Sequence, residues 1–362
     1  MSIKSLACYS MKPETSQMGH KQAQSPSKGI NPIRRFLMLD GASVAVVFIV
    51  LIAIFMITAP QAFLSHRVYM SFLATVPPPL IIALGVTLVA VAGEMDLSFP
   101  SVVAASSFIF GFMFQEWGVT WIALFAAVAV ATLMGFVNGL VVTLLGIPSL
   151  IATLAMLFLW GGLITVISGG IQLAIPDIYG TVLHSLLVGR IGGVLPAQII
   201  WTLGISLFIW LLLNRHRFGE NLLFIGDNLE VARVVGINAT IEKIKLFALS
   251  GGLAGLGGVL LTLETTAYFS SQGMGYLLTV IAAVFIGGTS IFGGSGKVIG
   301  TVFAAFIVTV IEAGLVASGI KGFWTRFFIG LVFVLSVTAN AIIEDPEKVP
   351  LVRLLRNKWF NR

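Results

Sequence analysis

Long apolar runs dominate this sequence and constrain its fold more than any other feature. A helix needs about 20 apolar residues to cross the hydrocarbon core of a bilayer. The segments that approach or exceed this length are 41–59, 72–92, 98–115, 119–145, 149–168, 197–213, 246–262, 275–290, 298–318 and 323–343. Their apolar residues are continuous and do not alternate, which favours helices over barrel strands. The sequence therefore predicts an all-α polytopic membrane protein with about ten transmembrane helices.

The positions of the basic residues predict the orientation of these helices. An even number of spans places both termini on one side, and Lys and Arg concentrate on the cytoplasmic side. If the termini are cytoplasmic, 17 of the 21 Lys and Arg residues lie inside. The four that would lie outside are Arg67, Arg190, Lys321 and Arg326. We therefore expect both termini in the cytoplasm.

This orientation divides the chain into three parts. Residues 1–35 are polar and predict a disordered cytoplasmic tail, 36–343 form the transmembrane domain, and 344–362 form a second cytoplasmic tail. A cytoplasmic loop at 214–245 interrupts the transmembrane domain. The net charge of +6 follows from basic residues at the inner membrane face, so the expected partner is the lipid bilayer and not nucleic acid.

No pattern in the sequence predicts catalysis, a cofactor or a metal site. The single cysteine, Cys8, rules out an internal disulfide. The stretch GGSGK at 293–297 lacks the first glycine and the final Ser or Thr of a phosphate-binding loop, since Ile291 and Val298 stand there. Only Glu312 lies well inside a predicted span, although a secondary carrier normally needs several ionisable groups there. A membrane-embedded enzyme is disfavoured for the same lack of clustered groups.

Two segments are poor continuous helices. The first, VAGEMDLSFPSVV at 91–103, places Glu94, Asp96 and Ser98 between Gly93 and Pro100. The second, IGGTSIFGGSGKVIG at 286–300, contains six glycines and begins with Gly287, Gly288 and Thr289. Interrupted segments in two halves of a membrane protein indicate a transport pathway, and ordinary turns between spans explain them equally well.

Three further polar or turn-forming residues are candidates for the same pathway, although a structural role is favoured for each. Asn138 lies beside Gly135 and Gly139, small residues that allow close helix approach, so an interhelical hydrogen bond is expected. Pro148 and Thr153 have the positions expected at the start of a helix. Asp96 or Ser98 is similarly expected to cap the helix that follows.

A charged segment, FGENLLFIGDNLEVARVVGINATIEKIKLFALSGG at 218–252, stands out from its apolar surroundings. Asp227 or Asn228 can cap a short amphipathic helix, and Gly236 can end it in the left-handed conformation. Glu230 and Arg233, three residues apart, would face solvent together. The pattern alone favours a helix lying on the membrane interface over one that binds a partner.

Four blocks in order resemble the permease subunits of bacterial ATP-binding-cassette importers of the ribose, xylose, arabinose and autoinducer-2 type. They are VAGEMDLSFPSVVA, GFVNGLVVTLLGIPSLIATLAM, FGENLLFIGDNLEVARVVGI and IAAVFIGGTSIFGGSGKVIGT. The resemblance covers roughly 70–340. Glu94 replaces a glycine of the family pattern, and Phe99 and Pro100 replace a small pair.

The resemblance implies an inner-membrane subunit that carries a monosaccharide or related small polyol and has no enzymatic activity of its own. It implies three protein partners: a cytoplasmic ATP-binding subunit, a periplasmic solute-binding protein and a second permease chain, identical or different. The segment LEVARVVG is similar to the family's coupling segment at Glu230, Ala232 and Gly236. With Asp227 and Arg233, these residues are expected to contact the ATPase. The runner-up function is a self-sufficient carrier or channel for a small hydrophilic solute.

Overall fold

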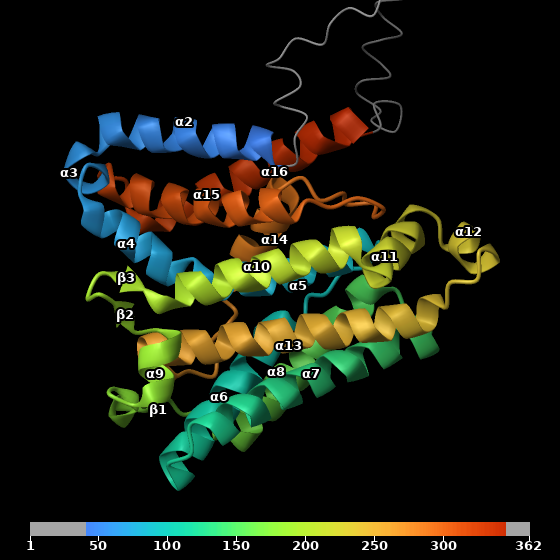
Figure 1. The fold of residues 1–362 in the computed structure, drawn as a ribbon, viewed down its shortest axis with the longest axis horizontal. Helices are drawn as coiled ribbons and strands as arrows, with labels where there is room; N and C mark the ends of the chain where they lie inside the picture. Colours follow the sequence, from blue (N-terminus) through green and yellow to red (C-terminus); the bar gives the residue numbers. More distant parts are fainter. Residues whose placement is uncertain (1–40, 345–362) are drawn as a thin grey trace, which may run out of the picture.

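The computed structural model describes residues 41–344, which form a helical bundle (Figure 1). The tail predicted over 1–35 and all but the first residue of the tail predicted over 344–362 lie outside the described residues. The α-helices are α2 (Ala42–Thr58), α3 (Pro60–Phe63), α4 (His66–Thr75), α5 (Pro77–Val91), α6 (Phe99–Trp117), α7 (Trp121–Leu144), α8 (Ser149–Ile167), α9 (Val182–Leu187), α10 (Ala197–Arg215), α11 (Arg217–Asp227), α12 (Leu229–Val234), α13 (Ala239–Thr265), α14 (Tyr276–Ile286), α15 (Val298–Ala317) and α16 (Thr325–Glu344).

Short elements complete the described chain. Two 3₁₀ turns cover Pro176–Ile178 and Gly322–Trp324. Strand β1 (Leu173–Ala174) pairs antiparallel with β4 (Ala267–Tyr268), and β2 (Arg190–Ile191) pairs with β3 (Leu195–Pro196) as a hairpin. These two small sheets connect helix ends and contribute no layer of their own.

Each of the ten apolar segments in the sequence overlaps one of these helices, which confirms an all-α polytopic membrane protein. Within the described part of the chain, α7, α8, α10, α13 and α15 are each long and apolar enough to cross a membrane. Helices α4 and α5 form a sixth candidate span, bent by 47°. The bend has a clear cause, because Pro77, Pro78 and Pro79 have no N–H to continue the hydrogen-bond ladder of α4.

Helix α5 forms the centre of the bundle. All of its residues are buried, and α10, α13, α14 and α15 contact it. On one side, α13 packs tightly along α7 through small residues. An added Cβ on Gly135 would overlap the carbonyl oxygen of Phe247, and one on Gly139 would lie 3.0 Å from the Cα of Ile244. The expected role of these two glycines in close helix approach is confirmed.

The two ends of the bundle differ in structure (Figure 1). One end carries α11 and α12, and the described chain also begins and ends there, with the start of α2 and the end of α16. The opposite end carries α3, α9 and the β2–β3 hairpin. Functional residues can therefore be assigned to one end or the other.

The structure contains helix α11 where the sequence predicted only a loop. Leu222 and Ile225 are buried on one side of α11, whereas Glu220 on the other side is exposed. This amphipathic pattern stabilises a helix by packing. The charges of the segment predict a loop with one short helix, and the packing that stabilises α11 is a tertiary effect.

Candidate functional site

The chain between α5 and α6 is non-helical, as the sequence predicted, and hydroxyl groups of α8 hold it in place. Residues 94–98 have no helix or strand assignment. The backbone N–H of Met95 donates to Ser149 Oγ at 3.0 Å, and that of Leu97 donates to Thr153 Oγ1 at 3.0 Å. Non-helical backbone at membrane depth requires such partners. Thr153 therefore supports the turn, and Pro148 precedes α8 at the N-cap position.

A chain of buried hydrogen bonds links this turn to α7 and α8. Asp96 Oδ1 accepts from Ser98 N at 2.8 Å and from Ser98 Oγ at 2.5 Å. Asn138 Nδ2 donates to Ser98 Oγ at 2.6 Å, and Trp160 Nε1 donates to Asn138 Oδ1 at 2.9 Å. The interhelical hydrogen bond expected of Asn138 is confirmed, and a network of this kind fixes one geometry for the turn.

The expectation that Asp96 or Ser98 caps α6 is wrong. Ser98 occupies the N-cap position, but its side chain makes no hydrogen bond to the first turn of α6. Its hydroxyl donates to Asp96 and accepts from Asn138. Asp96 accepts from Ser98 and does not reach the helix N–H groups beyond it. The tertiary network therefore replaces a local cap, which sequence spacing alone does not reveal.

The two glycine-rich segments meet the charged segment at a junction formed by Gly93, Gly226 and Gly293. A Cβ on Gly293 would lie 2.8 Å from the Cα of Gly93 and 2.8 Å from the carbonyl oxygen of Gly226. A Cβ on Gly226 would overlap the carbonyl oxygen of Val91. Because Gly226 and Gly293 leave no room for a side chain, the backbones of the α5 end, the α11 end and the 287–297 turn are in direct contact. We call this contact the glycine junction.

The predicted residues Gly287, Gly288 and Thr289 lie in that turn, between α14 and α15. Gly287 packs directly against Gly300 and Thr301 at the start of α15, and Gly288 has a φ of +87°. Thr289 is buried, and its hydroxyl has no hydrogen-bond partner within the described chain. A hydrogen bond of 2.9 Å from Gly294 N to Val91 O joins the turn to α5. Movement of any one of these backbones therefore displaces the other two.

Helix α12 projects from the same end of the bundle (Figure 1). Asn228 Oδ1 caps it by accepting from Glu230 N at 3.0 Å and Val231 N at 3.1 Å, while Gly236 ends it with a φ of +89°. These two expectations are confirmed. Asp227 instead lies at the end of α11 and does not cap α12.

The buried and exposed sides of α12 are clearly separated. Ala232 is fully buried and packs in a small cluster with Ile225 and Ala239. Val234 and Val235 are 86% and 63% exposed. Exposed valines on a capped, anchored helix form an apolar surface suited to a protein partner. The glutamate at position 230 is also exposed.

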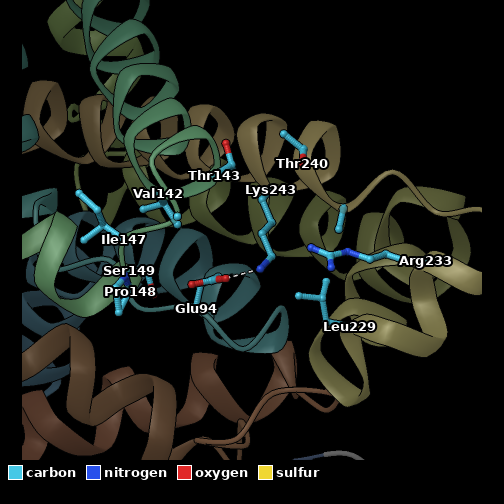
Figure 2. A pocket seen from close by; sticks show the side chains of 12 residues that line it. Glu94, Val142, Thr143, Ile147, Pro148, Ser149, Leu229, Arg233, Thr240 and Lys243 are labelled. Atoms are coloured by element: carbon cyan, nitrogen blue, oxygen red, sulfur yellow. Dashed lines mark hydrogen bonds and ion pairs between the residues drawn. The ribbon is translucent and has the colours of Figure 1, made fainter.

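A cleft of ≈290 Å³ separates α12 from the membrane helices. Figure 2 shows Lys243 of α13 paired with the Glu94 carboxylate, and Arg233 of α12 pointing into the same cleft. The side chains of Lys243 and Glu94 are 14% and 13% exposed. Glu94, which departs from the expected glycine, thus connects the 92–98 turn to the helix that follows α12.

At this end of the bundle, the described residues provide close backbone packing, hydrogen bonds and the ion pair between Lys243 and Glu94. Within residues 41–344, no group of three or more His, Cys, Asp or Glu side chains is placed to hold a metal ion. The cleft, the glycine junction and the hydrogen-bonded turn instead connect a projecting helix to a broken membrane helix. Broken membrane helices that are linked to a projecting surface helix point to a membrane transport protein.

Comparison with known proteins confirms this class. Residues 68–337 match the family described as the permease component of the branched-chain amino acid transport system, and the chain belongs to that family. It is 29% identical over 338 residues to the autoinducer 2 import system permease protein LsrC of Salmonella choleraesuis, covering 91% of this chain and 92% of that protein. No solved structure matches.

A second relative belongs to the same import system. The autoinducer 2 import system permease protein LsrD of Yersinia enterocolitica is 30% identical over 290 residues, covering 78% of this chain and 84% of that protein. The chain is therefore a multi-pass inner-membrane permease of the ATP-binding-cassette importer class, as the sequence motifs indicated.

Three residues of the site were not identified from the sequence. Lys243 lies in the charged segment and is one of several cytoplasmic charges there, and Ser149 and Trp160 lie in the apolar segment 149–168. Their partners, Glu94, Met95 and Asn138, are at least 22 positions away in sequence. The only local signal was the replacement of a small residue by a charged one at position 94, which requires a counter-charge when it is largely buried.

Proposed function

We propose that this chain carries a monosaccharide or related small polyol across the inner membrane and is driven by a separate ATP-binding subunit. The single observation that carries this proposal is α12, which is capped, anchored through Ala232 and displays exposed valines. Coupling to an ATPase requires an element that makes different contacts in the two states of that partner. A short rigid helix projecting from the bundle meets this requirement.

We further propose that α12 lies on the cytoplasmic side and that ten helices span the membrane. Arg67, Arg190 and Arg326 lie at the start of α4, in β2 and at the start of α16, the end opposite α12. Arg215, Arg217, Arg233, Lys243 and Lys245 gather around α11 and α12. This separation supports the orientation with more positive charge inside.

In this proposal, the residues of α12 have distinct roles. Val231 and Val234 contact the ATP-binding subunit, Glu230 sets the register, and Gly236 fixes the direction in which the chain leaves the helix. Arg233 and Asp227 lie nearer to the bundle: Arg233 lines the cleft, and Asp227 lies beside Gly294, the residue that follows Gly293 of the glycine junction. Contact with the partner would therefore be transmitted to both the cleft and the junction.

The residues of the proposed pathway belong to two turns. Asp96, Ser98, Asn138 and Thr153 hold the turn between α5 and α6, and Gly287, Gly288 and Thr289 hold the turn between α14 and α15. Both turns reach the glycine junction, so we propose that closure of the ATPase shifts them together and opens the pathway.

Transport also requires partners on the other side of the membrane and within it. We propose that a periplasmic solute-binding protein delivers the cargo and that a second permease chain, identical or different, completes the pathway. The relatives LsrC and LsrD are named as permease proteins of an autoinducer 2 import system. This supports a small hydrophilic cargo for the present chain as well.

Reconstitution into liposomes tests this function. The chain is incorporated with a candidate ATP-binding subunit, and ATP hydrolysis is measured with and without solute-loaded binding protein. Stimulated hydrolysis and ATP-dependent uptake are expected only when all components are present. Uptake driven by an ion gradient into liposomes that contain the chain alone would show a secondary carrier instead.

A further inference from the structure

A second pocket lies at the end of the bundle opposite α12. It has a volume of ≈290 Å³, and the side chains of Tyr179, His184, Arg190 and Glu264 line it. These residues come from three separate parts of the chain: the segment around α9, the β2–β3 hairpin and the end of α13. The roles described above use none of them.

The pocket has a rigid frame. Trp201 Nε1 of α10 donates to Leu186 O of α9 at 2.9 Å, and Ala197 N donates to Gly189 O at 2.8 Å. Thr181 Oγ1 caps α9 by accepting from His184 N at 3.2 Å. Polar groups that are held in fixed positions before binding lose little conformational entropy when a ligand arrives.

Buried Gln198 fixes the carboxylate of the pocket. Its Nε2 donates to Glu264 Oε2 at 3.1 Å and to Ala74 O at 2.5 Å, and the residue is fully buried. Both contacts need the amide N–H₂, so Oε1 is the carbonyl oxygen. That oxygen has no hydrogen-bond donor within the described chain. Gln198 does not line the pocket, so its role here is to position Glu264.

The charges of the pocket suit a neutral molecule. Arg190 and Glu264 carry opposite charges, and burial lowers the pKa of His184, which keeps the imidazole neutral at pH 7. The ring centroids of Tyr179 and His184 lie 4.7 Å apart with the ring planes tilted by 57°, so the two rings form an angled aromatic wall. A carboxylate, a guanidinium and aromatic rings together match the alternating hydroxyl and C–H groups of a polyol.

We propose that this pocket binds a neutral polyhydroxylated molecule, held by Glu264 and Arg190 and stacked on Tyr179. In this proposal the pocket makes the first contact of the permease with cargo. This role rests on the proposed function, which places this end of the bundle outside the cytoplasm. The lining also includes Ala74 of α4, so a bound molecule would lie against the first half of the bent α4–α5 span.

Direct binding to the isolated full-length chain tests the site without any partner. The purified protein in lipid nanodiscs is titrated with D-ribose, D-xylose and glycerol and followed by saturation-transfer NMR. We expect wild-type protein to bind at least one of these probes. Glu264→Gln keeps the hydrogen bond from Gln198 but removes the charge, and it should weaken binding about tenfold.

Two further variants make the result specific. Glu312→Gln removes an exposed carboxylate from α15, outside the pocket, and should leave probe binding unchanged. Tyr179→Ala removes a side chain that is 63% exposed, so it should fold normally and still weaken binding. It provides the test if Glu264→Gln proves unstable by thermal unfolding.

Three results would overturn the proposal: no binding of any probe, equal binding by wild type and both pocket variants, or loss of binding-protein affinity with probe binding unchanged. The last result would identify a protein-docking surface. If the chain binds sugar through Glu264 but stimulates no ATPase, the pocket proposal is supported and the proposed function is contradicted. If the chain stimulates the ATPase but probe binding does not depend on Glu264, the proposed function is retained and the pocket proposal is contradicted.

Discussion

Lys243, on the first turns of α13, pairs with the carboxylate of Glu94, in the turn that follows α5. The two residues are 149 positions apart in sequence, and both line the cleft between α12 and the membrane helices (Figure 2). It is the most direct side-chain link between the segment after α12 and the broken helix of the proposed pathway.

Breaking this pair is expected to weaken the fold and the coupling together. Glu94→Gln or Lys243→Gln leaves a largely buried charge without its partner and should cost about 1–3 kcal/mol, between the values for exposed and fully buried pairs. The double variant should cost less than the sum of the two. Thermal unfolding of all four proteins measures the coupling energy, and strictly additive losses would contradict a direct pair.

The glycine junction should not tolerate a side chain. Gly226→Ala forces a methyl group into the carbonyl of Val91, and overpacking of this kind costs about 1–3 kcal/mol. Gly204→Ala is the matched control, because Gly204 lies in α10 with no atom within 4 Å of an added Cβ. The control should be neutral or slightly stabilising. Equal unfolding temperatures for the two variants would show that the junction is not closely packed.

Gly236 should matter for function more than for stability. Gly236→Val places a β-branched residue at a φ of +89°, at a strain of roughly 1–2 kcal/mol, but meets no neighbouring atom. Gly118→Val imposes the same kind of strain at the end of α6, where φ is +65° and space is also open. Both proteins should insert into the membrane, and only Gly236→Val should lose ATP-dependent uptake. Normal solute accumulation by that variant would remove Gly236 from the coupling role.

The buried hydrogen-bond network predicts a non-additive pair of substitutions. Asn138→Leu leaves Trp160 Nε1 without its acceptor and should cost about 1–3 kcal/mol. Trp160→Phe removes that donor, so the second substitution should cost less in the Asn138→Leu background than in wild type. Denaturant or thermal unfolding gives the four free energies. Equal costs in both backgrounds would mean that the two side chains do not depend on each other.

The fold class was predictable from sequence because membrane helices are determined by local composition. Ten apolar segments gave ten overlapping helices, and Asn228 and Gly236 gave the limits of α12, since capping depends on residues three or four positions apart. Helix α11 was missed because its stabilisation comes from burial of Leu222 and Ile225, a tertiary effect.

The candidate site was only partly predictable. The interrupted segments around Asp96 and Gly287 were recognisable from their glycines and polar residues, but their contact at the glycine junction was not. Such contacts join backbones far apart in sequence and leave no periodic pattern. The partners of Glu94 and Asn138 were hidden for the same reason, and Gln198 was indistinguishable from any other residue at the start of a span.

We propose that α12 receives force from a separate ATPase through its exposed apolar surface. Its most direct test is co-purification of the ATP-binding subunit with wild type, Val234→Asp and Val182→Asp, since Val234 and Val182 are exposed valines at opposite ends of the bundle. An aspartate at a buried contact should weaken binding of the subunit about tenfold or more. Loss of the subunit with Val234→Asp alone is the predicted result. Undiminished co-purification and uptake with Val234→Asp would show that α12 does not couple the permease to the ATPase.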